Sequence, residues 1–234
     1  MRILFLHHST GGVIWNGGLK KHLKDLNSQN GTKHKIDERE FPKESPYGWN
    51  NYPFDYWNIW VNHGDEKNYM KEPTLGALTK KYGLIMWKHC FPVGEIKEDT
   101  GSPDINSDRK SLENYRLQYE ALKQKMHEYP STWFVVWTGA ALTKGSTDEQ
   151  SALRAKQFTA WVKDEWDEPG DNIFIWDFYE LETEGGLYLK DEYAKSPTNS
   201  HPNSSFAETA APLLSRRLAD VLDGRGDSTS LTGK

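Results

Sequence analysis

Short apolar runs recur along the chain, and small or polar residues follow each of them. A run of four to six apolar residues that ends in a turn signal is typical of a buried strand. The predicted strands cover residues 3–6, 35–41, 82–87, 133–137 and 172–176. The second differs from the others, because it alternates around Ile36 and ends before Pro42. This pattern predicts a strand near the edge of the sheet.

The segments between these runs have helical spacing. Apolar residues recur at intervals of three and four over residues 13–26 and, most regularly, over residues 111–128. Thr147 to Gln150 and Ser205 to Glu208 have the pattern of capping boxes, so we predict helices from there to Trp166 and Leu222. Strands alternating with helices indicate a doubly wound, three-layer α/β/α fold with a five-stranded parallel sheet.

The chain has no internal repeat and no composition shift that would mark a domain boundary. We predict one domain over residues 1–223 and a flexible, small and polar tail over residues 224–234. Residues 42–74 form a long, aromatic and proline-rich segment, with a short helix predicted near Asp55 to Trp60. This segment either shapes a binding cleft or closes over the core.

Composition restricts the class of partner. The 234 residues carry a net charge of −5 and no basic cluster, which argues against nucleic acid as a partner. No stretch approaches the roughly 20 apolar residues of a membrane span, so we expect no membrane partner. The localisation stays open: cytoplasmic as the sequence is written, or secreted or periplasmic if a leader was removed. The ten tryptophans belong either to the core or to a carbohydrate-binding cleft.

Polar side chains follow several of the predicted strands. Ser9 and Gly11 follow the first, Lys88 and His89 the third, Thr138 the fourth and Asp177 the fifth, while His201 precedes the last helix. Because the carboxyl ends of parallel strands share one edge, we expect these residues to meet there. Ser9 and His201 can supply a nucleophile and its base, and the N–H groups around Ser9 and Gly11 can supply oxyanion donors.

Each of these residues also has a structural interpretation. Ser9 suits a helix N-cap, His201 suits a turn, and Asp177 is a common residue type at a strand end. His7 is expected to be structural, whereas His8 adjoins the site and is a candidate substrate ligand. Cys90 is more typical of a buried small side chain than of a nucleophile. His8, His89, Cys90 and His201 show no metal-ligand spacing, so we predict neither metal nor cofactor.

Two short segments resemble the SGNH (GDSL-type) hydrolases. His8-Ser9-Thr10-Gly11 stands where that family has its Gly-Asp-Ser block, and Asn199-Ser200-His201-Pro202-Asn203 resembles its last block. The resemblance implies a flavodoxin-like α/β/α fold and an esterase or lipase activity, which in many members removes acetyl groups from carbohydrates. It also implies Ser9 as nucleophile and His201 as general base.

The sequence departs from the family pattern in three places. The aspartate that members usually carry two or three residues before the histidine is replaced by Asn199 or Thr198, and Asn199 can orient the ring without charge. The usual oxyanion asparagine after the third strand is missing, which leaves Lys88 or backbone N–H groups for that role. Gly48 is the best match for the second-block glycine.

We therefore expect a serine hydrolase, an esterase or deacetylase acting on a carbohydrate or small ester through Ser9, His201 and Asn199. His8, Gly11, Gly48, Lys88, His89, Thr138 and Asp177 are the candidate oxyanion or substrate-binding residues. A glycan-cleaving hydrolase or lyase that uses histidines and Asp177 as acid and base is one alternative. A carbohydrate-binding pseudoenzyme is the other. The oligomeric state stays open.

Overall fold

The computed structural model describes residues 1–48 and 50–234, and its centre is a five-stranded parallel sheet. The strand order is β2-β1-β5-β6-β7, and every neighbouring pair is parallel. This confirms the predicted fold class, with β2 at the predicted edge. The strands are β1 (Arg2–His7), β2 (Lys35–Glu40), β5 (Leu84–Trp87), β6 (Trp133–Trp137) and β7 (Ile173–Trp176).

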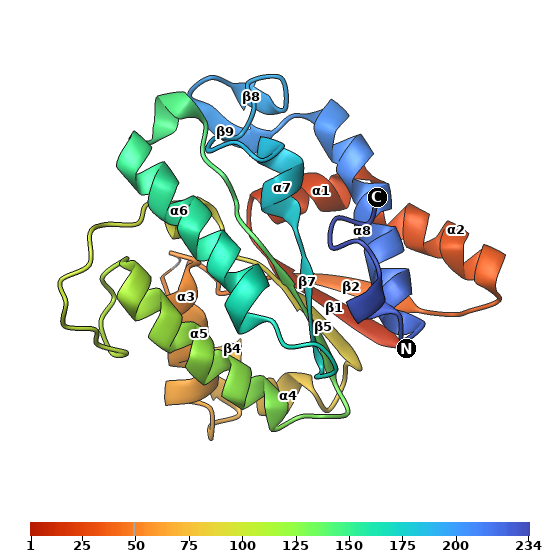
Figure 1. Cartoon of the computed structure of the whole chain (residues 1–234). Coiled ribbons are helices and arrows are strands. Elements are labelled where there is room, and N and C mark those ends of the chain that lie inside the picture. The colour runs from red at the N-terminus through yellow and green to blue at the C-terminus, as the bar shows by residue number, and fades with distance from the viewer. Residues whose placement is uncertain (49) are drawn as a thin grey trace.

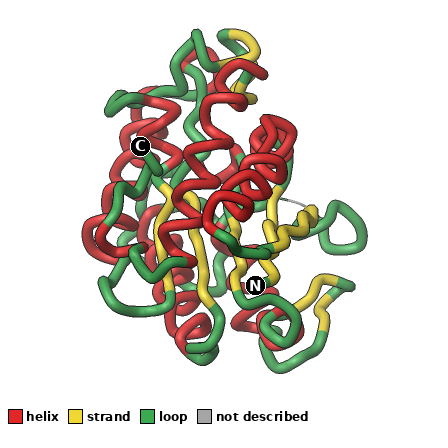
Figure 2. Tube along the Cα trace, turned by 90° about the vertical axis from the view of Figure 1, so that its right-hand side faces the viewer, coloured by secondary structure: helices red, strands yellow, loops and turns green. Residues whose placement is uncertain are grey.

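Helices cover both faces of this sheet (Figure 1). One face carries α1 (Thr10–Ile14), the π-helical η1 (Trp15–Leu19), α2 (Lys20–Asn30) and α8 (Ser204–Leu222). The other carries α3 (Pro53–Trp57), η2 (Asn58–Asn62), α4 (Leu75–Leu78), α5 (Leu112–His127), α6 (Glu149–Trp161) and η5 (Val162–Trp166). Figure 2, which faces the side that carries α2, shows helices in front of the strands.

Smaller elements complete the connections. They are the hairpins β3 (Asn68–Tyr69) with β4 (Glu72–Pro73) and β8 (Ala194–Ser196) with β9 (Asn199–Pro202), the helix α7 (Phe178–Thr183), and the 3-10 turns η3 (Phe91–Gly94), η4 (Lys144–Ser146) and η6 (Gly226–Ser228). Within the described part of the chain, no helix is both long and apolar enough to cross a membrane.

Alternation along the strands builds two hydrophobic cores. In β1, Leu4 and Leu6 pack with α3 and α5, whereas Ile3 and Phe5 pack with α8 on the opposite face. Successive side chains of a strand point to opposite faces, so a strand with helices on both sides must be apolar throughout. Burial of both faces of the strands thus explains the short apolar runs in the sequence.

Most of the aromatic residues belong to these cores. In the segment 42–74, Tyr56, Trp57 and Trp60 are buried on the face covered by α5. Trp87, Trp137, Trp161, Trp166 and Trp176 are buried as well. Trp49 lies outside the described residues. The aromatic segment thus closes over the core, and burial accounts for most of the tryptophans.

The structure corrects where three helices begin. The first helical region begins at Thr10 rather than Val13, and it bends at Gly18, whose φ is 102°. Asp148, not Thr147, is the N-cap of α6, because its side chain accepts the N–H of Ser151 at 2.9 Å. Asn203, not Ser205, is the N-cap of α8, and it accepts the N–H of Phe206 at 2.9 Å. The two predicted capping boxes are therefore wrong.

The last eleven residues fold back onto the sheet, in the segment where the sequence predicts a flexible tail. Asp177 donates its N–H to the carbonyl of Leu231 at 2.9 Å, and the indole N–H of Trp176 donates to the carbonyl of Thr232 at 3.1 Å. The buried Arg217 of α8 donates to Gly226 and Thr229. These bonds join the segment to β7 and α8.

Candidate active site

Ser9 lies between the end of β1 and the first residue of α1. Its backbone has φ 40° and ψ −97°, and a positive φ is uncommon in a residue with a side chain. Its position is that of an N-cap, yet its hydroxyl caps no backbone N–H. A strained residue at the turn from strand to helix presents its side chain outward from the sheet edge, and such strain is frequent at functional sites.

The hydroxyl of Ser9 contacts a histidine instead. Ser9 Oγ is hydrogen-bonded to Nε2 of His201, which lies 192 positions further along the chain. The other ring nitrogen, Nδ1, donates to Oδ1 of Asn199 at 2.8 Å, and the same oxygen accepts the N–H of His201 at 3.2 Å. This arrangement brings the three predicted catalytic side chains together in a hydrogen-bonded row. The Nδ1–H bond leaves the lone pair of Nε2 facing the serine.

The hairpin of β8 and β9 carries Asn199 and His201, and it is anchored on both sides. The N–H of Thr143, which follows β6, donates to Oγ of Ser200 at 3.0 Å. Asn203, next to the hairpin, donates to the carbonyl of Glu192 at 2.8 Å while its oxygen caps α8. Phe91 packs edge-on against the His201 ring, with 4.7 Å between ring centroids. The histidine is therefore held by contacts from several elements. Figure 1 shows the hairpin of β8 and β9 that carries it.

The environment of His201 favours its neutral form. Burial lowers the pKa of its ring, and the positive charges of Lys195 and Lys88 lower it further. An imidazole that is neutral near pH 7 can accept a proton, as a general base must. Asn199 contributes no opposing charge, because its side chain is an amide.

Lys88 and Glu182 are two further polar residues whose charges interact with each other. Both side chains are fully buried. Burial raises the pKa of Glu182 to about 8. Two groups act in the opposite direction and lower this pKa: the N–H of Ala141, which donates to the carboxyl at 2.7 Å, and the charge of Lys88. Burial lowers the pKa of the Lys88 ammonium group, whereas Cys90 and Glu182 raise it. Lys88 Nζ and Glu182 Oε1 have no hydrogen-bond partner within residues 1–48 and 50–234.

A buried ammonium group without a hydrogen-bond partner needs an explanation, because burying a charge in this way destabilises the folded state. Lys88 immediately follows β5, the strand beside β1, so it stands at the same sheet edge as Ser9. The charge of Lys88 lowers the pKa values of His7, His8 and His201. An anion that forms next to Ser9 would supply the missing partner. Glu182 is the buried polar residue of this region that the sequence did not indicate.

Three residues that flank Ser9 have structural contacts, namely His7, His8 and Gly11. His7 Nε2 pairs with Glu38 at 3.0 Å, and burial lowers the pKa of the His7 ring to about 3. The ring of His8 is hydrogen-bonded to the carbonyl of Pro42. The N–H of Gly11 donates to the carbonyl of His8 at 2.8 Å, so it is already engaged. The N–H groups of Ser9 and Thr10 donate to no backbone carbonyl in the described chain, so both are free to donate to another acceptor.

Four predicted binding residues make the contacts described here with groups other than Ser9 and His201. His89 is buried on the opposite face, among the rings of Tyr56 and Tyr119. Thr138 donates to Asp177 at 2.7 Å, and Lys163 pairs with the same carboxyl at 2.7 Å. Asp177 also caps α7. Gly48, with φ 86°, lies in an exposed turn.

Cys90 is a buried free thiol whose N–H donates to the carbonyl of Asn51 at 3.0 Å. It lies in the segment between β5 and η3 and makes no hydrogen bond to Ser9 or His201. In the chain as described, no three His, Cys, Asp or Glu side chains are grouped as metal ligands.

Comparison with solved structures agrees with the fold. The chain is similar to the acetyl xylan esterase AlAXEase, with a TM-score of 0.53 and 12% identity over 90% of this chain and 96% of that one. It is also similar to a gut microbial diltiazem-metabolizing enzyme, with a TM-score of 0.50 and 9% identity over 96% of this chain and 46% of that one. The chain thus spans about half the length of the second enzyme. At such identities the likeness shows the fold alone.

No protein-family model matches this sequence. No curated protein matches it either.

Proposed function

We propose that this protein is a serine hydrolase, an esterase or deacetylase that acts on a carbohydrate or a small ester. The observation that carries the proposal is the hydrogen bond from Ser9 Oγ to His201 Nε2, made by a serine with a left-handed backbone at the end of a central strand. Nucleophile and base within hydrogen-bond reach, with the base oriented by a third group, are the requirements of this chemistry.

In the proposed reaction, Ser9 Oγ attacks the acyl carbon while Nε2 of His201 takes the hydroxyl proton. The tetrahedral intermediate carries a negative oxygen. Its collapse breaks the ester bond, and His201 returns the proton to the departing alcohol. Water then attacks the acyl-serine with His201 as base, which releases the acid and restores Ser9. Asn199 accepts the Nδ1–H bond throughout, so it keeps the ring in the reactive tautomer.

Two kinds of hydrogen-bond donor stabilise the oxyanion in this proposal. The N–H groups of Ser9 and Thr10 are the backbone donors, and the unpartnered ammonium of Lys88 replaces the asparagine that SGNH hydrolases usually carry. Donors that are preorganised and shielded from water stabilise such a charge more than exposed ones do. We assign the chain on this basis to a divergent branch of the SGNH hydrolases, with residues 1–223 as the hydrolase domain.

The substrate class is proposed from the fold neighbour whose name states an acetyl xylan esterase. An acetylated sugar combines a small acyl group with an alcohol leaving group, which suits the serine mechanism described above. The glycan-cleaving alternative loses its proposed acid, because Asp177 is already engaged by Thr138 and Lys163.

Two assays test the proposal: hydrolysis of p-nitrophenyl acetate and labelling by a fluorophosphonate probe. We expect both with the native chain, and neither with Ser9→Ala or His201→Ala. Ser204→Ala is the matched control, since it removes an exposed hydroxyl at the start of α8 and leaves the site intact.

Labelling that persists in Ser9→Ala would exclude Ser9 as nucleophile. Sugar release from a glycan that survives Ser9→Ala would favour the glycan-cleaving alternative. Tight glycan binding by a native chain that neither hydrolyses the ester nor reacts with the probe would favour the binding protein.

A further inference from the structure

A large cavity opens on the α4–α5 side of the sheet, and neither Ser9 nor His201 lines it. Its volume is about 1390 Å³, far more than a single small ion would fill. Its walls come from the end of β2, the segment after η2, the turn between α4 and β5, and the end of α5. Its position and lining make it a separate surface from the proposed catalytic site.

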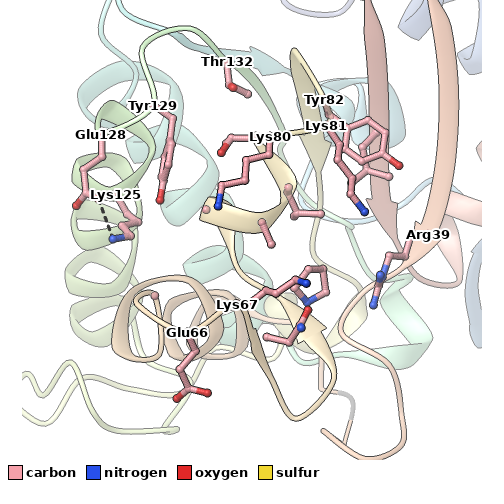
Figure 3. A pocket seen from close by; sticks show the side chains of 18 of the residues that line it. Arg39, Glu66, Lys67, Lys80, Lys81, Tyr82, Lys125, Glu128, Tyr129 and Thr132 are labelled. Atoms are coloured by element: carbon pink, nitrogen blue, oxygen red, sulfur yellow. Dashed lines mark hydrogen bonds and ion pairs between the residues drawn. The ribbon is translucent and has the colours of Figure 1, made fainter.

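Positive side chains dominate the rim of this cavity. They are Arg39, Lys43, Lys67, Lys80, Lys81 and Lys125. Figure 3 shows the end groups of Arg39, Lys67, Lys80 and Lys81 directed toward the shared open space from different sides. The chain as a whole has a net charge of −5, so this grouping runs against the general balance.

The rim also carries four carboxylates, Glu38, Asp65, Glu66 and Glu128. Glu128 pairs with Lys125, whereas Glu38 and Glu66 are hydrogen-bonded to the histidines His7 and His63. Arg39 pairs with the buried Glu72 at 3.2 Å.

Four lysines of the rim, Lys43, Lys67, Lys80 and Lys81, have no ion-pair partner in the part of the chain that the structure describes. The six basic side chains of the rim outnumber its four carboxylates, so the lining has a net positive charge.

The remaining lining suits a sugar chain. Thr79, Ser131 and Thr132 offer hydroxyl groups, and the rings of Tyr82 and Tyr129 offer flat apolar surfaces that end in a hydroxyl (Figure 3). Such rings combine apolar contact with a hydrogen bond. A ligand that is polar, ring-containing and negatively charged would use all three kinds of group.

We propose that this cavity binds an acidic glycan, a sugar chain that carries carboxylate or sulfate groups at intervals. The unpaired lysines come from three segments: Lys43 follows β2, Lys67 follows η2, and the adjacent Lys80 and Lys81 follow α4. Charges distributed in this way fit a chain with spaced anionic groups better than one compact anion.

A nucleic acid fits less well. Its charges are spaced about 1.7 Å apart along a duplex, and Asp65, Glu66 and Glu128 interrupt the basic rim. The proposal does not depend on the reaction at Ser9.

Binding of oligosaccharides to the full native chain tests this proposal. The probes are an unesterified oligogalacturonate, a sulfated oligosaccharide and a neutral xylo-oligosaccharide of equal length, measured by calorimetry at low and high salt. We expect binding of at least one acidic probe, no comparable binding of the neutral one, and an affinity that falls as salt rises, because exposed charges are screened. The comparison of the two acidic probes identifies the anionic group.

A triple variant, Lys67→Ala, Lys80→Ala and Lys81→Ala, should weaken binding of the acidic probe at least tenfold. The matched control is Lys24→Ala, Lys33→Ala and Lys97→Ala, which removes the same charge from exposed lysines outside the cavity and should bind as the native chain does. All six side chains are exposed, so both variants are expected to fold.

Four results would overturn the proposal. They are equal loss of affinity in both triple variants, neutral and acidic probes bound alike, inorganic phosphate displacing the acidic probe at equal concentration, and a single-stranded DNA oligonucleotide bound more tightly than either acidic glycan. Hydrolysis of p-nitrophenyl acetate is measured in parallel. A chain that binds the glycan without hydrolysing the ester would reject the proposed function and leave this proposal standing.

Discussion

Asn199 holds His201 through a neutral oxygen, at 2.8 Å from Nδ1. When His201 takes the proton of Ser9 in the proposed reaction, the new positive charge has no carboxylate beside it. A hydrogen bond to a charged group contributes about 1 kcal/mol more than a neutral one. The amide therefore orients the base well but stabilises its charged form weakly.

The variant Asn199→Asp should speed hydrolysis of p-nitrophenyl acetate. An additional 1 kcal/mol of stabilisation corresponds to about a fivefold rise in kcat. The new carboxylate also raises the pKa of His201, which burial, Lys195 and Lys88 hold below 6.5 in the native protein. The base is active when deprotonated, so the acid limb of the kcat/KM profile should move to higher pH. An acid limb that stays in place while kcat is unchanged would argue against His201 as base.

Lys88 permits a second test. Lys88→Met removes the proposed oxyanion donor and replaces a buried charge with an apolar chain of similar length. We expect kcat to fall by about 10²–10³, with little change in KM. Thermal stability should stay equal or rise, since removal of an unpartnered buried charge relieves its desolvation cost. The control, Cys90→Ala, alters a buried neighbour outside the machinery. A lower Tm with unchanged kcat would make Lys88 a structural residue.

The residues that the sequence identified are those whose role depends on position along a strand. Ser9 follows an apolar run and His201 precedes an amphipathic helix, so their common edge followed from topology. Glu182 had no such signal. It lies in a six-residue helix in which Glu180 is only half-buried and Glu182 is fully buried. Tertiary packing alone decides which of these two carboxylates faces inward.

At the scale of elements, the turn from β1 to α1 depends on a close approach. A Cβ on Gly11 would overlap Cβ and Cγ of His7, whereas a Cβ on Gly12 would lie 3.6 Å from the nearest atom of the same ring, an ordinary contact. His7 is itself fixed by Glu38 of β2. The start of α1 therefore sits where it does only because residue 11 has no side chain.

Gly11→Ala should destabilise the protein and lower its activity, with Gly12→Ala as the matched control. Overpacking of this kind costs about 1–3 kcal/mol. A shift of α1 also moves Ser9 away from His201, so hydrolysis should fall more than the folded fraction does. Chemical denaturation and esterase assays of both variants check this. Equal behaviour of the two alanines would contradict the role assigned to Gly11.

Element types were more predictable than element boundaries. The pattern gave the five strands and the long helices, but it chose the wrong caps for α6 and α8. Thr147 and Asp148 are adjacent and both suit an N-cap, so local chemistry does not separate them. At α8, Asn203 is selected because it also donates to the carbonyl of Glu192. That contact comes from a distant turn and is invisible in local spacing.

For the whole molecule, the segment 224–234 shows the limit of composition as evidence. Its small polar side chains resemble those of disordered tails, yet its backbone carbonyls accept bonds from Trp176 and Asp177. Sequence patterns describe side chains, so they contain little information about bonds to the backbone. The five-stranded parallel sheet with helices on both faces followed from the side-chain pattern, because buried strands and amphipathic helices leave a periodic signal.

Removal of residues 229–234 should lower the stability of the whole domain. The deletion leaves the N–H of Asp177 and the indole N–H of Trp176 without their acceptors. Unmet buried donors cost about 1–3 kcal/mol each. A loss of about 2 kcal/mol corresponds to roughly 4–8 °C in Tm for a chain of this size. Calorimetry checks this, and an unchanged Tm would show that the segment is dispensable.

The separation of Ser9 and His201 by 192 positions has a consequence for biosynthesis. Synthesis runs from the N-terminus, so the serine is made 192 residues before the histidine. A nascent chain can form β1 and its neighbours early, yet it holds an unassisted serine until β9 leaves the ribosome. The chemistry proposed for the pair can start only after β9 has been made, and a chain cut short before the hairpin of β8 and β9 would lack the base.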